Sequence, residues 1–384
     1  MRSAVITDSD IEALIPYSGK EVFFAVSPGG VVILKPATEM TMKEKNLIEK
    51  KKRSEERIYV PTDKLELNQY QILNLRSLRS EASGRFCGPK AANLGELKYN
   101  FPDKVVEGLV IPFSIFRKHL EQPMPGTGES YWQFLQNIFV QNKDSAAGKT
   151  MEKINEDQIL SGFERFRSAI KAISFLPGFR DSLANAFEHI LCHNIGTIPV
   201  FIRSDTNMED LKDFTGAGLN LTVFNVLDRE KIFQAIRDVW ASPYTERSYR
   251  WRQRYLMNPE NVYPSILIIP AVNVDKSGVM ITTGVSSSNP QDITIAFNRG
   301  AGGVVEGQIA ESYLLKHDGS TALLSPAREY FYTSLPAHGG ILNEYTGFDR
   351  PILSTDNLEQ IRQLAREISK IRYQTNVSNL LNLP

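Results

Sequence analysis

The sequence predicts an α+β protein in which a cleft separates two subdomains. Strand-like and helix-like segments are mixed along the chain, and the strand-like segments suggest two sheets. The 384 residues also exceed what one compact core usually holds, so two or three subdomains are expected.

Composition narrows the classes of function. The hydrophobic share of 42% and the charged share of 23% are ordinary for a globular protein. Lysine plus arginine and aspartate plus glutamate each number 44, and this zero net charge argues against broad binding to nucleic acid or to an anionic membrane. No apolar run is long enough to span a bilayer, and the first residues lack the apolar core of a signal peptide. We therefore expect no nucleic-acid partner and no membrane.

Cysteine and histidine usage points to the cytoplasm and away from a zinc site. Cys87 and Cys192 are too few for a disulfide scaffold, which fits a reducing cytoplasm. We interpret Cys87 as a small packing residue rather than a reactive thiol. The five histidines are scattered along the chain, and we expect no zinc site.

Residues 1–80 are expected to form an accessory region with a small β-hairpin module. Residues 21–26 and 31–35 are rich in strand-forming side chains and flank a Pro-Gly turn at 27–30. Residues 43–57 are dense in charge and predict a solvated helix or linker, with a binding tail as the alternative.

A glycine-bearing loop opens a predicted helix over residues 87–98. Gly88, just before the helix start, leaves backbone N–H groups and the positive end of the helix dipole available to an anion. Lys90 stands at this start, where its cation would suit a phosphate. The alternative is a solvated lysine, which the helix dipole disfavours unless an anion joins it.

Residues 105–116 predict an apolar strand and a turn that contains Pro112, and a helical block is expected after them. A further amphipathic helix is expected after Asn225, with Trp240 on its apolar face. Three amphipathic helices between these segments are predicted from apolar residues at helical spacing, interpreted as core: Trp132, Leu135, Ile138 and Phe139; Ile159, Phe163, Phe166 and Ile170; Leu183, Phe187 and Ile190.

Three strands and a final helix complete the expected elements. Residues 265–272 predict a buried strand, and residues 277–283 predict its neighbour across a turn. Residues 293–298 predict a third strand. Residues 355–371 predict an amphipathic helix with Thr355 as its N-cap.

Residues 200–211 carry the most chemical information. An apolar run leads into Arg203 and an expected loop of hydroxyl, amide and acidic side chains. The sequence Gly-Ala-Gly follows at 216–218. The donor fork of arginine suits phosphate oxygens, and glycines let backbone N–H groups approach them closely. The alternative is a surface turn in which Arg203 pairs with Asp210.

Two segments in order carry a resemblance to a known family. GPKAANLGEL at 88–97 and VFIRSDTNMEDL at 200–211, with GAG at 216–218, are similar to the family patterns GGKGANLGEL, VRSSATxED and xAGx. They resemble the N-terminal nucleotide-binding domain of the phosphoenolpyruvate synthase and pyruvate phosphate dikinase family. Rifampicin phosphotransferases and glucan water dikinases share this domain.

The resemblance implies an ATP-grasp fold, in which two lobes clasp a nucleotide. Residues 84–240 would form the first lobe, with a helical insert, and residues 241–384 the second. The first eighty residues lie outside the resemblance.

The resemblance also implies the ATP site. Lys90 and Arg203 match the family's ATP-binding lysine and arginine, and both are the candidate catalytic residues. Asp205 and Thr206 stand where the family usually has serine and alanine, a departure that bears on the phosphate contacts. The loop over the phosphates would comprise Ser204, Asp205, Thr206, Gly216 and Gly218.

The implied adenine hinge departs from the family pattern. Ile269 and Ala271 lie in the segment whose backbone would read the purine edge, but the family's glutamine is missing. Pro270 between them has no N–H to donate. Residues 299–303, RGAGG, fall where the family has a GLGE-like turn, and Arg299 could serve phosphate.

Magnesium ligands are not identified by the sequence. Glu209 and Asp210 match an acidic pair of the family, and a metal role and a helix-dipole role remain equally open. The family's closing segment, DIEW followed by QxRP, is not found after Ile371. The resemblance implies an ATP-binding domain that uses Mg²⁺ and passes a phosphoryl group to a histidine on a partner domain or chain. The alternative is a catalytically degenerate nucleotide-binding or interaction module.

His338 does not supply that acceptor histidine. The sequence Ala337–Gly340 has the letters of the family's histidine motif in the wrong order, and we expect His338 to be a turn residue.

Overall fold

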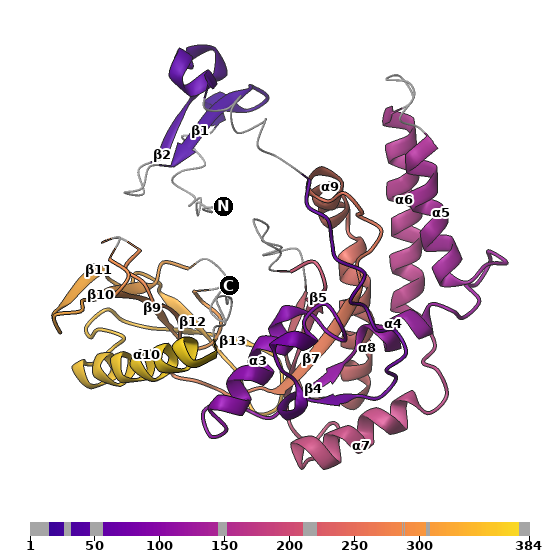
Figure 1. The fold of residues 1–384 in the computed structure, drawn as a ribbon. Helices are drawn as coiled ribbons and strands as arrows, with labels where there is room; N and C mark the ends of the chain where they lie inside the picture. Colours follow the sequence, from indigo (N-terminus) through magenta and orange to yellow (C-terminus); the bar gives the residue numbers. More distant parts are fainter. Residues whose placement is uncertain are drawn as a thin grey trace. The chain divides into compact units, whose positions relative to one another are not determined.

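The computed structural model describes residues 15–26, 32–46, 57–144, 152–209, 221–285, 287, 289–304 and 308–375 (Figure 1). The chain divides into two compact units, Met1–Ile58 and Tyr59–Pro384. Each unit is described by itself. Helices and sheets are segregated into packed layers, so the fold class is α+β, as predicted.

The first unit contains the predicted hairpin. Strands β1 (Val22–Val26) and β2 (Val32–Pro36) pair antiparallel, with Val22 opposite Pro36. Two short 3₁₀ helices accompany them, η1 (Ile15–Tyr17) and η2 (Ala37–Glu39). The turn between the strands lies outside the described residues.

The second unit is built on a five-stranded antiparallel sheet in the order β3-β4-β7-β5-β6. Strand β7 is central and pairs with β5 from Val200 opposite Pro270 to Thr206 opposite Pro264. The strands are β3 (Leu73–Asn74), β4 (Leu109–Ile111), β5 (Val200–Thr206), β6 (Thr222–Val226) and β7 (Pro264–Pro270).

One face of this sheet is covered by the helical block. The three predicted amphipathic helices are confirmed, as is the helix after Asn225. The strand and turn predicted up to Phe116 are wrong at their end, because Pro112 caps a helix that begins at Phe113. The helices are α4 (Phe113–His119), α5 (Tyr131–Asp144), α6 (Glu152–Lys171), α7 (Phe179–Leu191), α8 (Arg229–Ala241) and α9 (Glu246–Tyr255), with the 3₁₀ turn η6 (Ser242–Tyr244).

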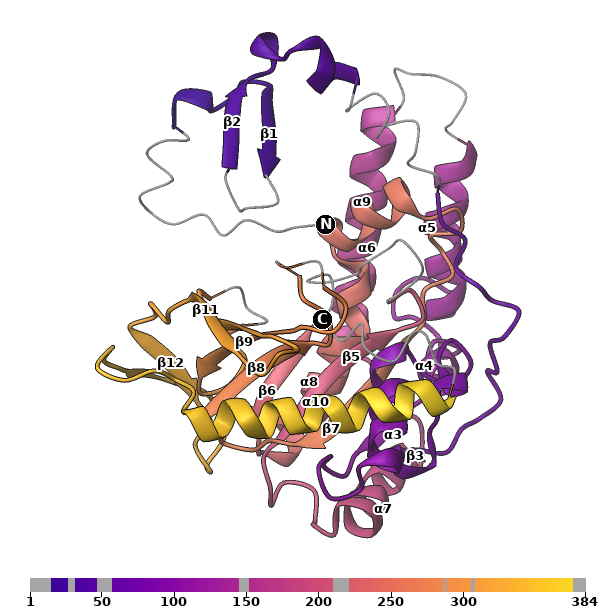
Figure 2. The ribbon, with the colours of Figure 1, turned by 60° about the vertical axis from the view of Figure 1, so that its left-hand side comes forward.

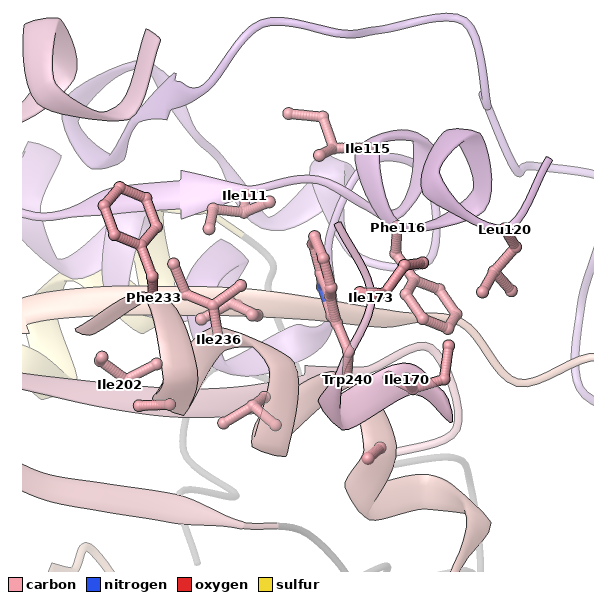
Figure 3. Close-up of a cluster of buried hydrophobic side chains, with 14 of the residues drawn as sticks. Ile111, Ile115, Phe116, Leu120, Ile170, Ile173, Ile202, Phe233, Ile236 and Trp240 are labelled. Carbon is pink, nitrogen blue, oxygen red and sulfur yellow. The ribbon is translucent and has the colours of Figure 1, made fainter. Parts of the chain in front are cut away.

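The largest hydrophobic core lies between these helices and the sheet (Figure 3). Trp240 of α8 is fully buried, and its indole ring lies 5.7 Å from the Phe116 ring of α4, between centroids. Ile111 and Ile202 enter the same core from β4 and β5. Burial of such apolar area is the main favourable contribution to folding.

The opposite face of the sheet carries helix α3 (Pro89–Asn100) and the 3₁₀ turns η3 (Leu75–Ser77) and η4 (Ser80–Ala82). Val110 and Leu267 point into this second core, while their chain neighbours point into the first. This is the alternation that a strand buried on both faces must show. Cys87 is fully buried here, as a packing residue is expected to be.

A second sheet has the order β11-β10-β9-β8, and helix α10 (Thr355–Thr375) packs along it (Figure 2). Strand β8 was predicted to neighbour β7, and this is wrong because β8 pairs with β9 in this other sheet. The strands are β8 (Lys276–Ile281), β9 (Ile293–Arg299), β10 (Glu311–Leu315) and β11 (Thr321–Ser325), with a separate hairpin of β12 (Phe331–Ser334) and β13 (Leu342–Tyr345).

Across the described ranges, no helix is both long and apolar enough to pass through a bilayer.

Candidate functional site

The candidate site lies where the first turn of α3 meets the end of β5. Asp205, at the penultimate position of β5, is fully buried beneath that turn. Its Oδ1 accepts the backbone N–H of Lys90 at 2.9 Å, and its Oδ2 accepts that of Ala91 at 3.1 Å. The first N–H groups of a helix have no partner within the helix, so this carboxylate supplies the cap.

Ser265 of β7 ties this cap to the centre of the sheet. Its hydroxyl oxygen lies 2.6 Å from the carbonyl oxygen of Asp205 and 3.2 Å from Oδ2. The same oxygen accepts the N–H of Gly88 at 3.1 Å. A Cβ atom at Gly88 would lie 2.3 Å from Oδ1 of Asp205, so only glycine allows this approach.

The ammonium group of Lys90 turns back onto β5. Its Nζ donates to the carbonyl oxygen of Ser204 at 3.2 Å and forms an ion pair with Oε2 of Glu209 at 2.5 Å. The Lys90 side chain is 18% exposed and that of Glu209 is 6% exposed. Glu209 also accepts the N–H of Thr206 at 3.3 Å. The Lys90–Glu209 pair is therefore mostly shielded from water, where charge interactions are stronger.

Two carboxylates thus approach one ammonium group. Burial, and next the negative charge of Glu209, raise the pKa of Asp205 to about 7, against the opposing effects of Lys90 and the two backbone N–H groups. Burial, and next the charge of Asp205, raise the pKa of the Cys87 thiol well above its usual range. Cys87 is therefore a neutral neighbour and an unreactive thiol.

Arg203 lies on the same face of β5 as Asp205, two residues before it. Side chains two positions apart in a strand share a face, so Arg203 and Asp205 both face α3. The Arg203 side chain is half-buried, and within the described parts of the chain no acidic side chain pairs with it. A cation in this setting is suited to an anionic ligand.

The prediction that Ser204, Asp205 and Thr206 form a loop is wrong, because all three belong to strand β5 and pair with β7. Ser204 and Thr206 occupy the alternate positions of the strand. Ile202 points into the helical core, so Ser204 and Thr206 share that face, and both are buried. The hydroxyl of Ser204 has no hydrogen-bond partner among the described residues. Ser204 therefore contributes its backbone carbonyl oxygen, and not its hydroxyl, to the surroundings of Lys90.

The other predicted site residues are distributed as follows. Gly216, Gly218 and Asp210 lie outside the described residues. Ile269 is half-buried on β7 and packs against the core on the α3 face. The N–H of Ala271 donates to the carbonyl oxygen of Pro199 at 2.9 Å, so this donor is already engaged.

Arg299 is the last residue of β9 in the second sheet, whereas Lys90 lies at the start of α3 against the five-stranded sheet. It lines a pocket of about 190 Å³ together with Glu311, Phe331 and Phe348. Its Nη2 donates to the carbonyl oxygen of Arg350 at 3.0 Å.

His338 lies in a turn, as predicted, and is exposed. The side-chain amide of Asn225 holds this turn by donating to the carbonyl oxygens of Pro336 at 2.8 Å and Gly340 at 2.7 Å. Within the residues that the structure describes, no cluster of three or more histidine, cysteine or acidic side chains is arranged to hold a metal ion.

Sequence reasoning missed the roles of Ser265 and Gly88 and the partner of Glu209. The Gly-Pro pair at the start of α3 is a signal for a close approach, but it does not say which residue approaches. The matching residue lies more than a hundred positions away, as Asp205 does.

Comparison with known proteins now decides the family. Residues 85–377 match the model of the pyruvate phosphate dikinase AMP/ATP-binding domain. The chain belongs to this family. The resemblance drawn from the GPKAANLGEL and IRSDTNMEDL segments is thereby confirmed.

The chain is similar to parts of several longer proteins. The chain is 26% identical over 198 residues to a probable phosphoenolpyruvate synthase of Archaeoglobus fulgidus, covering 51% of the chain and 24% of that protein. It is 24% identical over 268 residues to the phosphoenolpyruvate synthase of Pyrococcus furiosus, covering 60% of the chain and 30% of that protein. It is 26% identical over 281 residues to the rifampicin phosphotransferase of Bacillus subtilis, covering 73% and 30%. The chain therefore matches less than a third of the length of these relatives.

Proposed function

We propose that this domain binds Mg-ATP with Lys90 and Arg203 and passes a phosphoryl group to a histidine on a partner domain or chain. The observation that carries the proposal is that Lys90 and Arg203 are presented on the same face of the sheet. Nζ of Lys90 lies 3.2 Å from the backbone oxygen of Ser204, the residue next to Arg203. Two cations on one face of a sheet, both partly accessible, suit the β- and γ-phosphates of a nucleotide.

Family membership supports an ATP-grasp arrangement of two lobes. We assign to the first lobe residues 84–240 together with β7, the central strand of its sheet, and to the second lobe the rest of residues 241–384. In this arrangement Gly216 and Gly218 belong to the loop over the phosphates, and the backbone groups of Ser204 and Thr206, which lie in β5, border the phosphate site. Ile269 and Ala271 form the adenine side. Because the Ala271 N–H is engaged, its carbonyl oxygen is the group we assign to the purine edge.

Phosphate binding requires a change of partner at Lys90. Its ammonium group is neutralised by Glu209, so an incoming phosphate competes with that carboxylate. Mg²⁺ would supply part of the positive charge that the transferred phosphoryl group needs. We place the reaction in the cytoplasm, in keeping with the unpaired cysteines Cys87 and Cys192.

Equilibrium binding of Mg-ATP to the wild-type chain and to Lys90→Ala and Arg203→Ala tests the proposal. Each variant loses a charge-assisted contact, so its affinity should fall about tenfold or more. Lys171→Ala is the control, because that side chain is 55% exposed and belongs to another element. Unchanged affinity in both site variants would contradict the assignment.

Transfer is tested separately. A single-turnover assay with radiolabelled ATP, with and without a histidine-bearing domain of a relative, should give a labelled, acid-labile phosphohistidine. Tight binding of ATP without any transfer would favour the second candidate, a nucleotide-binding module that has lost catalysis.

A further inference from the structure

We infer that Asp205 is a positioning residue for Lys90: its carboxylate fixes the first turn of α3 on β5 and so fixes where the Lys90 ammonium meets phosphate. The inference rests on the proposed role of Lys90 in ATP binding. In this role Asp205 contacts the backbone of α3 and not the nucleotide.

Asp205 caps α3 through the backbone of the residue that it positions. One of the two N–H groups that Asp205 accepts belongs to Lys90 itself, and the other belongs to Ala91. The N-cap residue Gly88 has no side chain and makes no side-chain cap. The cap therefore comes from another element, and it acts on the backbone of the very residue whose side chain matters.

The carboxylate of Asp205 is held rigidly by its neighbours. Asp205 is fully buried, and the hydroxyl of Ser265 lies within hydrogen-bond distance of both its carbonyl oxygen and its Oδ2. Gly88 leaves no room for a Cβ between the turn and the carboxylate. A side chain held in this way has one position, and it transmits that position to the start of α3.

The cap at α3 also decides which groups can receive a phosphate. A helix N-terminus with free N–H groups is a ready anion site. Here Asp205 already occupies the N–H groups of Lys90 and Ala91, so the α3 terminus cannot receive a phosphate oxygen. Phosphate recognition on this side therefore falls to the Lys90 ammonium, which makes its placement decisive.

Removal of the cap should release Lys90. In Asp205→Asn one oxygen can still accept an N–H, but the amide nitrogen faces the other donor and cannot accept it. In Asp205→Ser the side chain is too short to reach both N–H groups. Both variants should leave the Lys90 side chain more mobile and more accessible.

The first measurement is ATP-independent labelling of lysines by acetic anhydride, read by mass spectrometry. In Asp205→Asn, labelling of Lys90 should rise about tenfold, the expected effect of losing one charge-assisted hydrogen bond. Lys104, whose side chain is 55% exposed, is the internal reference and should not change. Unchanged labelling of Lys90 would overturn the inference.

The second measurement is a double-mutant cycle on Mg-ATP affinity. Asp205→Asn should weaken ATP binding about tenfold in the wild-type background and by less than about twofold in Lys90→Ala, because the lost interaction acts through Lys90. An equal loss in both backgrounds would overturn the inference, since a general folding defect does not depend on Lys90.

Glu311→Gln is the matched control. Glu311 is also a buried carboxylate that accepts two backbone N–H groups, those of Ile352 and Leu353, both at 2.9 Å. Its loss should lower stability but leave Lys90 labelling unchanged. Ser265→Ala is the milder variant if the Asp205 variants do not fold, and it should raise Lys90 labelling by a smaller factor.

The two proposals fail separately. Absence of ATP binding by the wild-type chain would contradict the proposed function, while the labelling result would still decide whether Asp205 fixes Lys90.

Discussion

Lys90 and Glu209 form a mostly buried ion pair in which Nζ and Oε2 are 2.5 Å apart. The pair occupies the cation that we assign to phosphate, so Glu209 acts as the counter-charge of Lys90 while the nucleotide is absent. This relationship leads to the first prediction.

Glu209→Gln should destabilise the ligand-free chain and strengthen ATP binding. Removal of one partner of a buried pair costs up to about 3 kcal/mol, because the other charge stays buried and uncompensated. ATP would restore the missing anion, so its affinity should rise several-fold. Calorimetric unfolding and equilibrium binding measure the two effects.

The control for this variant is Glu230→Gln. Glu230 pairs with Arg180 at 2.8 Å, but both side chains are exposed. Its loss should change stability little, because the pair is exposed to solvent, and leave ATP affinity unchanged. Weaker ATP binding in Glu209→Gln would contradict the competition between Glu209 and phosphate.

Asp205 should make stability fall as pH rises toward neutrality. Burial and the neighbouring Glu209 raise its folded-state pKa from 3.8 to about 7. The protonated form is therefore favoured in the folded state, and this contribution is complete near pH 4 and lost as pH rises to 7. The groups that face Asp205 are Lys90 of α3, Glu209 after β5 and the neutral thiol of Cys87.

Urea unfolding of wild type and Asp205→Asn from pH 5 to pH 8 tests this dependence. The unfolding free energy of the wild type minus that of Asp205→Asn should fall as pH rises to about 7 and then stay level. A difference that does not vary with pH would show that Asp205 keeps an ordinary pKa.

His119 should have the opposite pH dependence. It is buried, its Nδ1 lies 2.7 Å from the carbonyl oxygen of Ile115, and its Nε2 accepts the N–H of Leu176 at 3.2 Å. Burial lowers its pKa from 6.5 to about 4, against the bond to Ile115. Its contribution to stability is present above pH 6.5 and is lost as pH falls toward 4.

His119→Leu should remove the loss of stability that protonation of His119 causes as pH falls toward 4. It should also cost about 1–3 kcal/mol at neutral pH, because the N–H of Leu176 is left without its acceptor. Unfolding measured from pH 7 down to pH 4.5 gives both quantities. A variant with the same acid dependence as the wild type would place the responsible group elsewhere.

Arg252 should not tolerate lysine. Its guanidinium is fully buried and donates to the carbonyl oxygens of Pro243 at 2.7 Å and Pro259 at 3.1 Å. Burial lowers its pKa to about 10. A lysine lacks the planar fork that reaches both carbonyls, so Arg252→Lys should cost about 2–3 kcal/mol.

The control lies on the same helix. Arg247 of α9 is exposed, so Arg247→Lys should change the unfolding free energy by no more than about 0.5 kcal/mol. If the two variants unfold at the same temperature, the two carbonyl contacts of Arg252 contribute nothing to stability.

Local patterns in the sequence predicted the elements well. The glycine before α3 and the apolar run of β5 are signals within a few residues, and each marked a real boundary or strand. The predicted N-cap of α10 is wrong by one residue, because Thr355 is the first helical residue and the hydroxyl of Ser354 accepts the N–H of Asn357 at 3.2 Å. The hairpin of β1 and β2 was predicted for the same reason.

Pairing between distant segments was harder to predict. Strands β7 and β8 follow each other closely, yet they belong to different sheets, because strand propensity does not say which partner a strand will take. The cap of α3 by Asp205 depends on a contact between segments far apart in the sequence. The motif therefore indicated phosphate chemistry near Lys90 but not that an aspartate already fills the helix terminus.

The central claim is that ATP binds against Arg203 and Lys90. Thermal unfolding of the wild-type chain and of Arg203→Ala, with and without Mg-ATP, tests it most directly. ATP at about a hundred times its dissociation constant should add roughly 2.7 kcal/mol to wild-type stability, a shift of a few degrees at most for a chain of this length. The account predicts that this shift disappears in Arg203→Ala, and an equal shift in both proteins would contradict it.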